Sequence, residues 1–170
     1  SKDSKIINIF VNFDVFFRKL SFLNYFLKGR FEYEGLTFYH DINDTSVASS
    51  ILTNGIYEPE LLKEIKSTLI NGSTFIDGGA NIGFFSLIAT KIIGPKGVVI
   101  AFEPTPLTSS FLKKNIKINN INNVVVSNNG LSSSEKYLPF VLTNEPEGNS
   151  IIFDKEKNLS NKNEIINIKT

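Results

Sequence analysis

The chain has 170 residues, enough for one domain with a small appendage, and 41% of them are hydrophobic, enough for a globular core. Its formal net charge of +1 gives no sign of a nucleic-acid-binding tail. The absence of cysteine excludes disulfides and cysteine metal sites, and the single histidine, His40, leaves no histidine cluster for zinc.

The most hydrophobic stretch, residues 6–27, is predicted to be an amphipathic helix. Its apolar side chains recur at steps of three and four residues: Ile6, Phe10, Phe13, Phe17, Leu20 and Leu27. Charged residues interrupt the stretch, so it has no run of about 18 apolar residues to span a membrane, and it lacks the features of a signal peptide. We expect a cytoplasmic protein in which this helix covers the core or a partner chain. The alternative is a helix lying on a membrane surface.

Residues 30–57 are predicted to form a hairpin and a short helix. The hairpin turns at Glu34 and Gly35, and the helix runs from Asp44 as its N-cap to Gly55. A second helix follows, with Pro59 in its first turn and Gly72 as its stop. We therefore divide the chain into an N-terminal part, residues 1–57, and a main domain, residues 58–170.

From residue 73 the sequence alternates between short apolar strands and helices. Buried strands are predicted in "STFID" and "GVVIAFE", and a third strand in "NNVVVSN". Helices are predicted in "NIGFFSLIATKII" and "PLTSSFLKKNIKIN", the second with Thr105 as N-cap and Pro106 at the first position. This alternation predicts a parallel sheet with helical crossovers, the beginning of a doubly wound α/β fold.

After Gly130 the pattern changes to antiparallel strands. "EKYLPFVLT" and "NSIIF" are predicted to pair around "NEPEGN", and "IINIKT" opens a final strand. Three parallel strands are fewer than a whole doubly wound domain has, so the chain is expected to end partway through its fold.

The turn after the first parallel strand is the predicted ligand site, because such sheets bind ligands at the carboxyl ends of their strands. It reads Asp77, Gly78, Gly79, Ala80, Asn81, Ile82 and Gly83. Gly79 and Gly83 allow the backbone to approach a ligand. A helix beginning near Asn81 would present free N–H groups to it, and Asp77 could accept a hydrogen bond or pair with a positive group.

Glu103 ends the second strand, 20 residues after Gly83, where an acidic side chain of a βαβ unit meets ribose hydroxyls. Ala80 occupies a glycine position of the dinucleotide fingerprint, and the P-loop motif is absent, so NAD and ATP in those binding modes are disfavoured. A carboxylate in the turn would repel a pyrophosphate. It suits a ligand with ammonium and sulfonium groups, such as S-adenosylmethionine.

The segments "FIDGGANIGFFSLIATK" and "VVIAFEPTPLTSSFLKKNIKINN" resemble the FkbM-type class I methyltransferases, and the resemblance runs from about Tyr57 to the chain end. It implies a Rossmann-like fold, S-adenosylmethionine as methyl donor and O-methylation of a sugar, glycan or natural-product hydroxyl. It also implies cofactor-binding residues. The glycine turn and Glu58 would surround the methionine end, Glu103 the ribose, Phe102 and Pro104 the adenine faces, and Asn128 and Gly130 its edge.

Two features depart from the family's pattern, and the catalytic base has no candidate. Gly78 stands where an aliphatic residue is commoner, and the family's segment that shapes the acceptor site is missing. His40 is favoured as a surface or packing residue. The rival interpretations are a non-catalytic adenosine-ligand-binding fragment and an interaction module, dimeric or membrane-docked, that uses the aromatic N-terminal helix.

Overall fold

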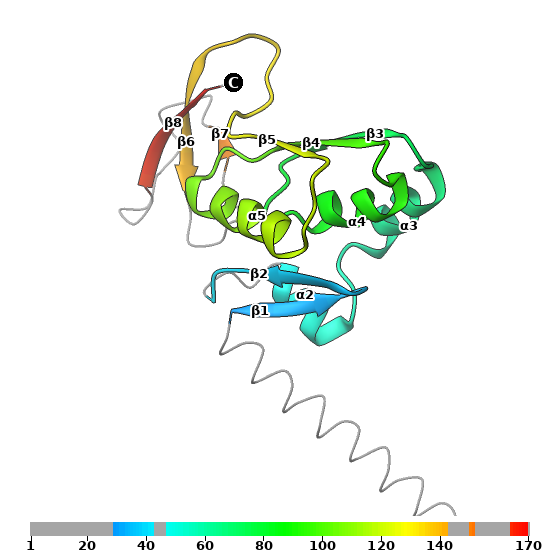
Figure 1. Ribbon diagram of the computed structural model, residues 1–170. Coiled ribbons are helices and arrows are strands. Elements are labelled where there is room, and N and C mark those ends of the chain that lie inside the picture. Colours follow the sequence, from blue (N-terminus) through cyan, green and yellow to red (C-terminus); the bar gives the residue numbers. More distant parts are fainter. Residues whose placement is uncertain (1–28, 43–46, 143–149, 152–163, 170) are drawn as a thin grey trace, which may run out of the picture.

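The computed structural model describes residues 29–42, 47–142, 150–151 and 164–169 (Figure 1). The predicted helix over residues 6–27 and the predicted N-cap Asp44 lie outside these ranges. Within them the chain forms three β-sheets, one after another along the sequence: a two-stranded antiparallel sheet, a three-stranded parallel sheet and a three-stranded antiparallel sheet.

The predicted hairpin is confirmed. Strands β1 (Arg30–Tyr33) and β2 (Leu36–Tyr39) pair antiparallel, and the turn residues Glu34 and Gly35 both have positive φ, 46° and 75°. Positive φ at both positions gives the turn a twist that matches the strands it joins.

Two short helices follow the hairpin. In α2 (Val47–Asn54) the predicted end is confirmed, because the Gly55 N–H donates to the carbonyl of Ile51. Helix α3 (Pro59–Thr68) begins at Pro59 as predicted. It ends before the predicted stop at Gly72, which lies in the following turn with its N–H bonded to the carbonyl of Ile93. This turn leads the chain into β3 (Thr74–Gly78), beside Ile93 at the end of the next helix.

The predicted parallel sheet is also confirmed. Strands β3 (Thr74–Gly78), β4 (Val98–Phe102) and β5 (Val124–Ser127) lie in the order β3-β4-β5, joined by helices α4 (Phe84–Ile93) and α5 (Pro106–Ile118). Consecutive strands that run outward in chain order form half of a Rossmann-like sheet. The fold is therefore α/β, and the carboxyl ends of all three strands meet at one edge.

The prediction that β3 is buried is wrong. Helices α4 and α5 lie on the same face of the sheet, and no described element covers the other (Figure 1). On that open face Ile76 is 60% exposed and Val125 is 57% exposed. Continuous apolar strands are typical of sheets covered on both faces, so the sequence pattern is that of a more fully covered sheet.

One hydrophobic core joins the hairpin and α2 to the helices beneath the sheet. The ring of Phe84, at the start of α4, lies 5.0 Å from the Tyr33 ring, 5.6 Å from the Phe38 ring and 5.7 Å from the Tyr57 ring, centroid to centroid. The hairpin and Tyr57 thus pack directly against the start of α4.

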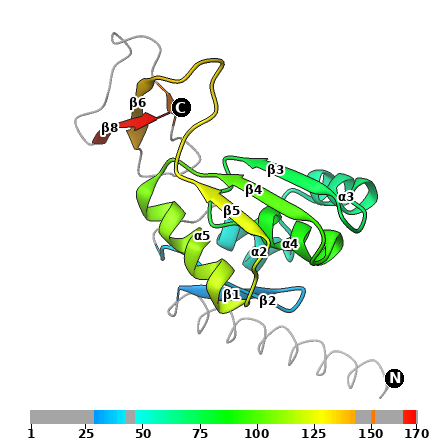
Figure 2. The same cartoon turned by 45° about the horizontal axis from the view of Figure 1, so that its top comes forward.

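A second sheet contains strands β6 (Tyr137–Leu142), β7 (Ser150–Ile151) and β8 (Glu164–Lys169), with both β7 and β8 antiparallel to β6. This confirms the predicted pair around residues 143–149 and the final strand. Figures 1 and 2 show this sheet beyond the carboxyl ends of β3, β4 and β5. A hydrogen bond from the Gly130 N–H to the Lys169 carbonyl ties its last strand to the end of β5.

Candidate functional site

The glycine turn, residues 78–83, joins β3 to α4 at the carboxyl edge of the parallel sheet. The prediction that the helix begins near Asn81 is wrong, because α4 begins at Phe84. The φ angles of Gly79, Asn81 and Gly83 are 86°, 51° and 89°, which is left-handed backbone that no α-helix contains. Asparagine is the non-glycine residue that tolerates this conformation best, which explains Asn81.

Within the glycine turn, the N–H groups of residues 79–83 all have acceptors inside the protein. Those of Gly79 and Ala80 donate to the Phe102 carbonyl, that of Asn81 to Glu103 Oε2, that of Ile82 to Asn81 Oδ1 and that of Gly83 to the Ala80 carbonyl. Phosphate-binding turns work by pointing free N–H groups at the anion. In this conformation residues 79–83 have none to offer, so the turn is not a phosphate cradle.

Glu103 is 6% exposed and holds the turn from the end of β4. Its Oε2 accepts the Asn81 N–H at 2.9 Å, and its Oε1 accepts the N–H of Thr105, the N-cap residue of α5, at 2.8 Å. Burial raises the pKa of Glu103, and these hydrogen bonds oppose that shift. A carboxylate has about four lone-pair positions, so acceptor capacity remains after the two backbone bonds.

Asp77 lies near the end of β3, and its side chain contacts the start of α4. Its Oδ2 accepts the hydroxyl hydrogen of Ser86 at 2.5 Å. Burial raises the pKa of Asp77, and hydrogen bonds from the Ser86 hydroxyl and backbone N–H oppose the shift. Because Gly83 has no side chain to cap α4, the Asp77 carboxylate takes that role at the positive end of the helix.

The two carboxylates are brought together, as predicted. Asp77 is close enough that its charge contributes to the raised pKa of Glu103. Asp77 is half-buried while Glu103 is buried. A ligand carrying positive charge would relieve the repulsion between them, and a pyrophosphate would add to it.

The raised pKa values predict a pH dependence of stability. A carboxyl with a raised folded pKa binds its proton more tightly when folded, so its stabilising contribution is full below the ordinary carboxyl pKa of about 4 and is lost as the pH rises through the folded pKa. Asp77→Asn removes one such titration. The free energy of unfolding of this variant, relative to wild type, should therefore increase as the pH rises from about 4 to 7, measured by urea unfolding. If the difference in free energy of unfolding between Asp77→Asn and wild type stays constant or falls over this pH range, the raised pKa of Asp77 is contradicted.

Gly78 and Pro104 flank the two carboxylates. A Cβ at Gly78 would lie 2.9 Å from Leu131 Cδ1. An aliphatic residue at this position would require the Leu131 side chain to move, and Leu131 is 56% exposed. Pro104 is half-buried between Glu103 and Thr105. Its role as a cofactor-binding residue stays a prediction.

Asn128 and Glu58 remain predictions as cofactor-binding residues. Asn128 follows β5, donates to Ser109 Oγ at 2.6 Å and accepts from Lys113 Nζ at 2.7 Å, so its contacts are with α5. Glu58 is exposed and caps α3 with φ of 41°. The residue before it, Tyr57, contacts the rings of Phe84 and Phe85 at the start of α4.

His40 packs in the interior, as the favoured prediction has it. It is 3% exposed, its Nδ1 lies 2.7 Å from the Asp41 carbonyl, and its ring lies 6.0 Å from that of Phe31. It thus sits with the hairpin and makes no contact with Asp77 or Glu103 among the interactions of the described residues.

Sequence reasoning missed two buried polar residues of the site, Ser86 and Asn115. Both are 0% exposed. Ser86 holds Asp77, and Asn115 donates to the Ile82 carbonyl of the turn at 2.9 Å. The sequence did contain a signal for Asn115. It shares the buried stripe of α5 with Thr108 and Leu112, and a polar side chain buried there needs a hydrogen-bond partner.

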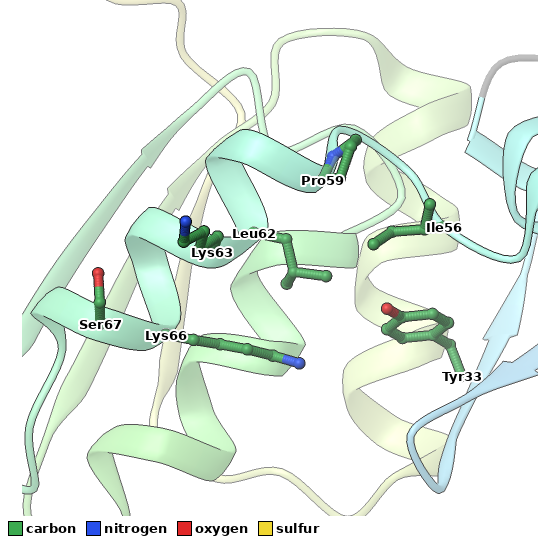
Figure 3. A pocket seen from close by; sticks show the side chains of 7 residues that line it. All are labelled: Tyr33, Ile56, Pro59, Leu62, Lys63, Lys66 and Ser67. Carbon is green, nitrogen blue, oxygen red and sulfur yellow. The ribbon is translucent and has the colours of Figure 1, made fainter.

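A hollow of about 440 Å³ lies between α3 and the hairpin (Figure 3). Leu62 forms its floor, Tyr33 faces it from the hairpin, and Lys66 crosses it to an ion pair with Glu34. None of its lining residues belongs to the glycine turn.

In the described part of the chain, no three His, Cys, Asp or Glu residues group as a metal site, and no helix is long and apolar enough to span a membrane.

The chain is similar to two curated fungal proteins. "Methyltransferase sdnD" of Sordaria araneosa is 38% identical over 84 residues, which are 49% of this chain and 32% of that protein. "Methyltransferase 1" of Beauveria bassiana is 31% identical over 85 residues, 50% of this chain and 34% of that protein. The chain therefore spans about a third of the length of these relatives. No protein-family model matches it.

Two solved structures are also similar in part. M. jannaschii TYW2 in complex with AdoMet is 27% identical, with 57% of this chain and 41% of that chain covered and a TM-score of 0.42. A SAM-dependent methyltransferase from Aquifex aeolicus is 27% identical, with 54% and 46% covered and a TM-score of 0.40. TM-scores below 0.5 do not establish a common fold, so the fold rests on the strand order and connections described above.

Proposed function

We propose that the glycine turn and its two carboxylates bind S-adenosylmethionine. One observation carries this proposal: Asp77 and Glu103 lie together at the turn while every N–H of residues 79–83 is already bonded. Such a turn offers negative charge and acceptors but no donors. It suits an adenosine ligand with positive charge, and S-adenosylmethionine carries both a sulfonium and an ammonium group.

The residues have distinct roles in this proposal. Half-buried Asp77 faces the positive groups of the ligand, and Ser86 fixes its orientation. Glu103 accepts the ribose hydroxyls with the acceptor capacity that remains after the N–H groups of Asn81 and Thr105 and the Thr105 side chain have donated to it. Phe102 and Pro104 flank the adenine. The remainder of the turn and Glu58 surround the methionine end, and Asn128 lies at the adenine edge.

We further propose that the protein is a methyltransferase of the FkbM type that acts on a hydroxyl of a sugar, glycan or natural product. The names of the two fungal relatives support methyl transfer. Bound S-adenosylmethionine would supply an electrophilic methyl group to the acceptor oxygen. The protein would contribute alignment of the acceptor and removal of the hydroxyl proton. The described residues provide the half of the site that holds the methyl donor.

Calorimetric titration tests the ligand. The chain should bind S-adenosylmethionine and S-adenosylhomocysteine, and it should bind ATP and NAD at least about tenfold more weakly because the turn has no free N–H for phosphate. Equal or tighter binding of ATP or NAD would overturn the assignment, as would no binding of either S-adenosyl compound. Transfer of a labelled methyl group to hydroxyl acceptors then separates an enzyme from a fragment that only binds.

A further inference from the structure

Two asparagines at the C-terminal end of α5, Asn115 within the helix and its C-cap residue Asn119, join the hairpin to the helix. Asn119 accepts the Thr37 N–H at 2.8 Å and donates to the Thr37 carbonyl at 2.7 Å. Asn115, one turn earlier, accepts the Tyr39 N–H at 2.6 Å and donates to the Tyr39 carbonyl at 3.0 Å. Each side-chain amide thus pairs with one residue of β2 as a neighbouring strand would. Figure 1 shows β2 lying alongside α5.

The two asparagines differ in the acceptor of their second amide hydrogen. That of Asn119 goes to the Asn115 carbonyl at 2.7 Å, at the end of the same helix, and that of Asn115 goes to the carbonyl of Ile82 at 2.9 Å, in the glycine turn. Ile82 is 1% exposed. The first carbonyl that accepts a hydrogen bond from α4 is that of Gly83, which bonds the Leu87 N–H, so the Ile82 carbonyl lies just outside the helix. A buried carbonyl outside the helix needs a partner from elsewhere. Asn115 supplies it, and both of its donors are then used.

The turn is consequently held on two sides by the segment from β4 to α5. Glu103 binds the Asn81 N–H from one side, and Asn115 binds the Ile82 carbonyl from the other. These two bonds act on adjacent residues of the turn. They fix the backbone of Asn81 and Ile82, the two residues before Gly83. Asn81 and Gly83 both have left-handed backbone.

We propose that Asn115 is a positioning residue of the cofactor site, and that through it the hairpin stabilises the glycine turn in its binding conformation. The positioning itself follows from the contacts above, and its effect on affinity rests on the proposed function. The hairpin is accordingly part of the cofactor site's support. Asn119 docks the same strand without touching the turn, so it provides a matched control.

The test compares Asn115→Leu with Asn119→Leu. Both variants lose an amide that pairs with β2, and only the first also frees the Ile82 carbonyl. In the free proteins, hydrogen exchange of the Ile82 and Gly83 amides should accelerate at least about tenfold more in Asn115→Leu than in Asn119→Leu. Equal acceleration in the two variants would overturn the positioning role. This readout requires no cofactor, so it stands even if the cofactor assignment fails.

The second readout is the affinity for S-adenosylmethionine, measured where circular dichroism shows each variant folded. Asn115→Leu should raise the Kd about tenfold or more and Asn119→Leu less than about threefold. Equal changes would overturn the link to affinity, whereas absence of binding by wild type would instead refute the proposed function. Should Asn115→Leu not fold, wild type suffices: the cofactor should slow exchange of the Tyr39 amide more than that of Thr37. Equal slowing would contradict the proposal.

Discussion

Glu103→Ala is expected to lose both stability and cofactor affinity, and it should have the largest effect on binding of any substitution in the described site. It removes the acceptor of the Asn81 and Thr105 N–H groups. Leaving buried donors unpaired costs about 1–3 kcal/mol each, so the free energy of unfolding should fall by roughly 2–6 kcal/mol. Loss of the ribose acceptor should raise the Kd for S-adenosylmethionine at least about a hundredfold.

Glu103→Gln separates the two effects. The amide keeps the volume and one acceptor oxygen, so this variant should lose less stability than Glu103→Ala, measured by urea unfolding. It still lacks the second oxygen and the charge, so its affinity should remain low. An unchanged affinity in either folded variant would refute the role of Glu103 in binding. Glu135→Gln, an exposed change in the segment before β6, should leave affinity unchanged.

Gly83→Ala should be the most disruptive change within the turn. The residue has φ of 89°, and an added Cβ would lie 2.5 Å from Leu112 Cδ1 and 3.0 Å from Leu87 Cδ1. Both leucines are 0% exposed, so neither can move into solvent. Left-handed backbone costs a non-glycine residue about 1–2 kcal/mol, and overpacking adds about 1–3. We expect a loss of roughly 2–5 kcal/mol in urea unfolding.

Gly79→Ala is the matched control, because it has nearly the same backbone without the crowding. Its φ is 86°, and nothing lies within 4 Å of an added Cβ. Only the conformational cost of about 1–2 kcal/mol should remain. If both substitutions destabilise equally, close packing at Gly83 is not what fixes the turn.

Much of the fold could be predicted because its signals are local. Glu34 and Gly35 define the hairpin, and Pro59 and Pro106 each mark the first turn of a helix. The alternation of apolar strands and helices indicates parallel pairing. The position of α4 could not be predicted as well, since Asn81 and Ile82 are compatible with a helix and tertiary hydrogen bonds hold them in a turn.

The candidate site could be predicted in its charges but not in its hydrogen bonds. The ends of adjacent parallel strands bring Asp77 and Glu103 together, and that follows from topology alone. Which N–H groups Glu103 accepts depends on the path of the turn. The contact of Asn115 with Ile82 joins residues 33 positions apart, so no short-range pattern contains it. The exposure of Ile76 likewise depends on which face the helices cover.

Mapping of backbone amide chemical shifts tests the central claim most directly, because it reports which ligand the glycine turn meets. On addition of S-adenosylmethionine, the amide signals of residues 77–83, Glu103 and Thr105 should shift, while ADP at the same concentration should leave them in place. The opposite result, in which ADP shifts the amides of residues 79–83 and S-adenosylmethionine does not, would contradict the account.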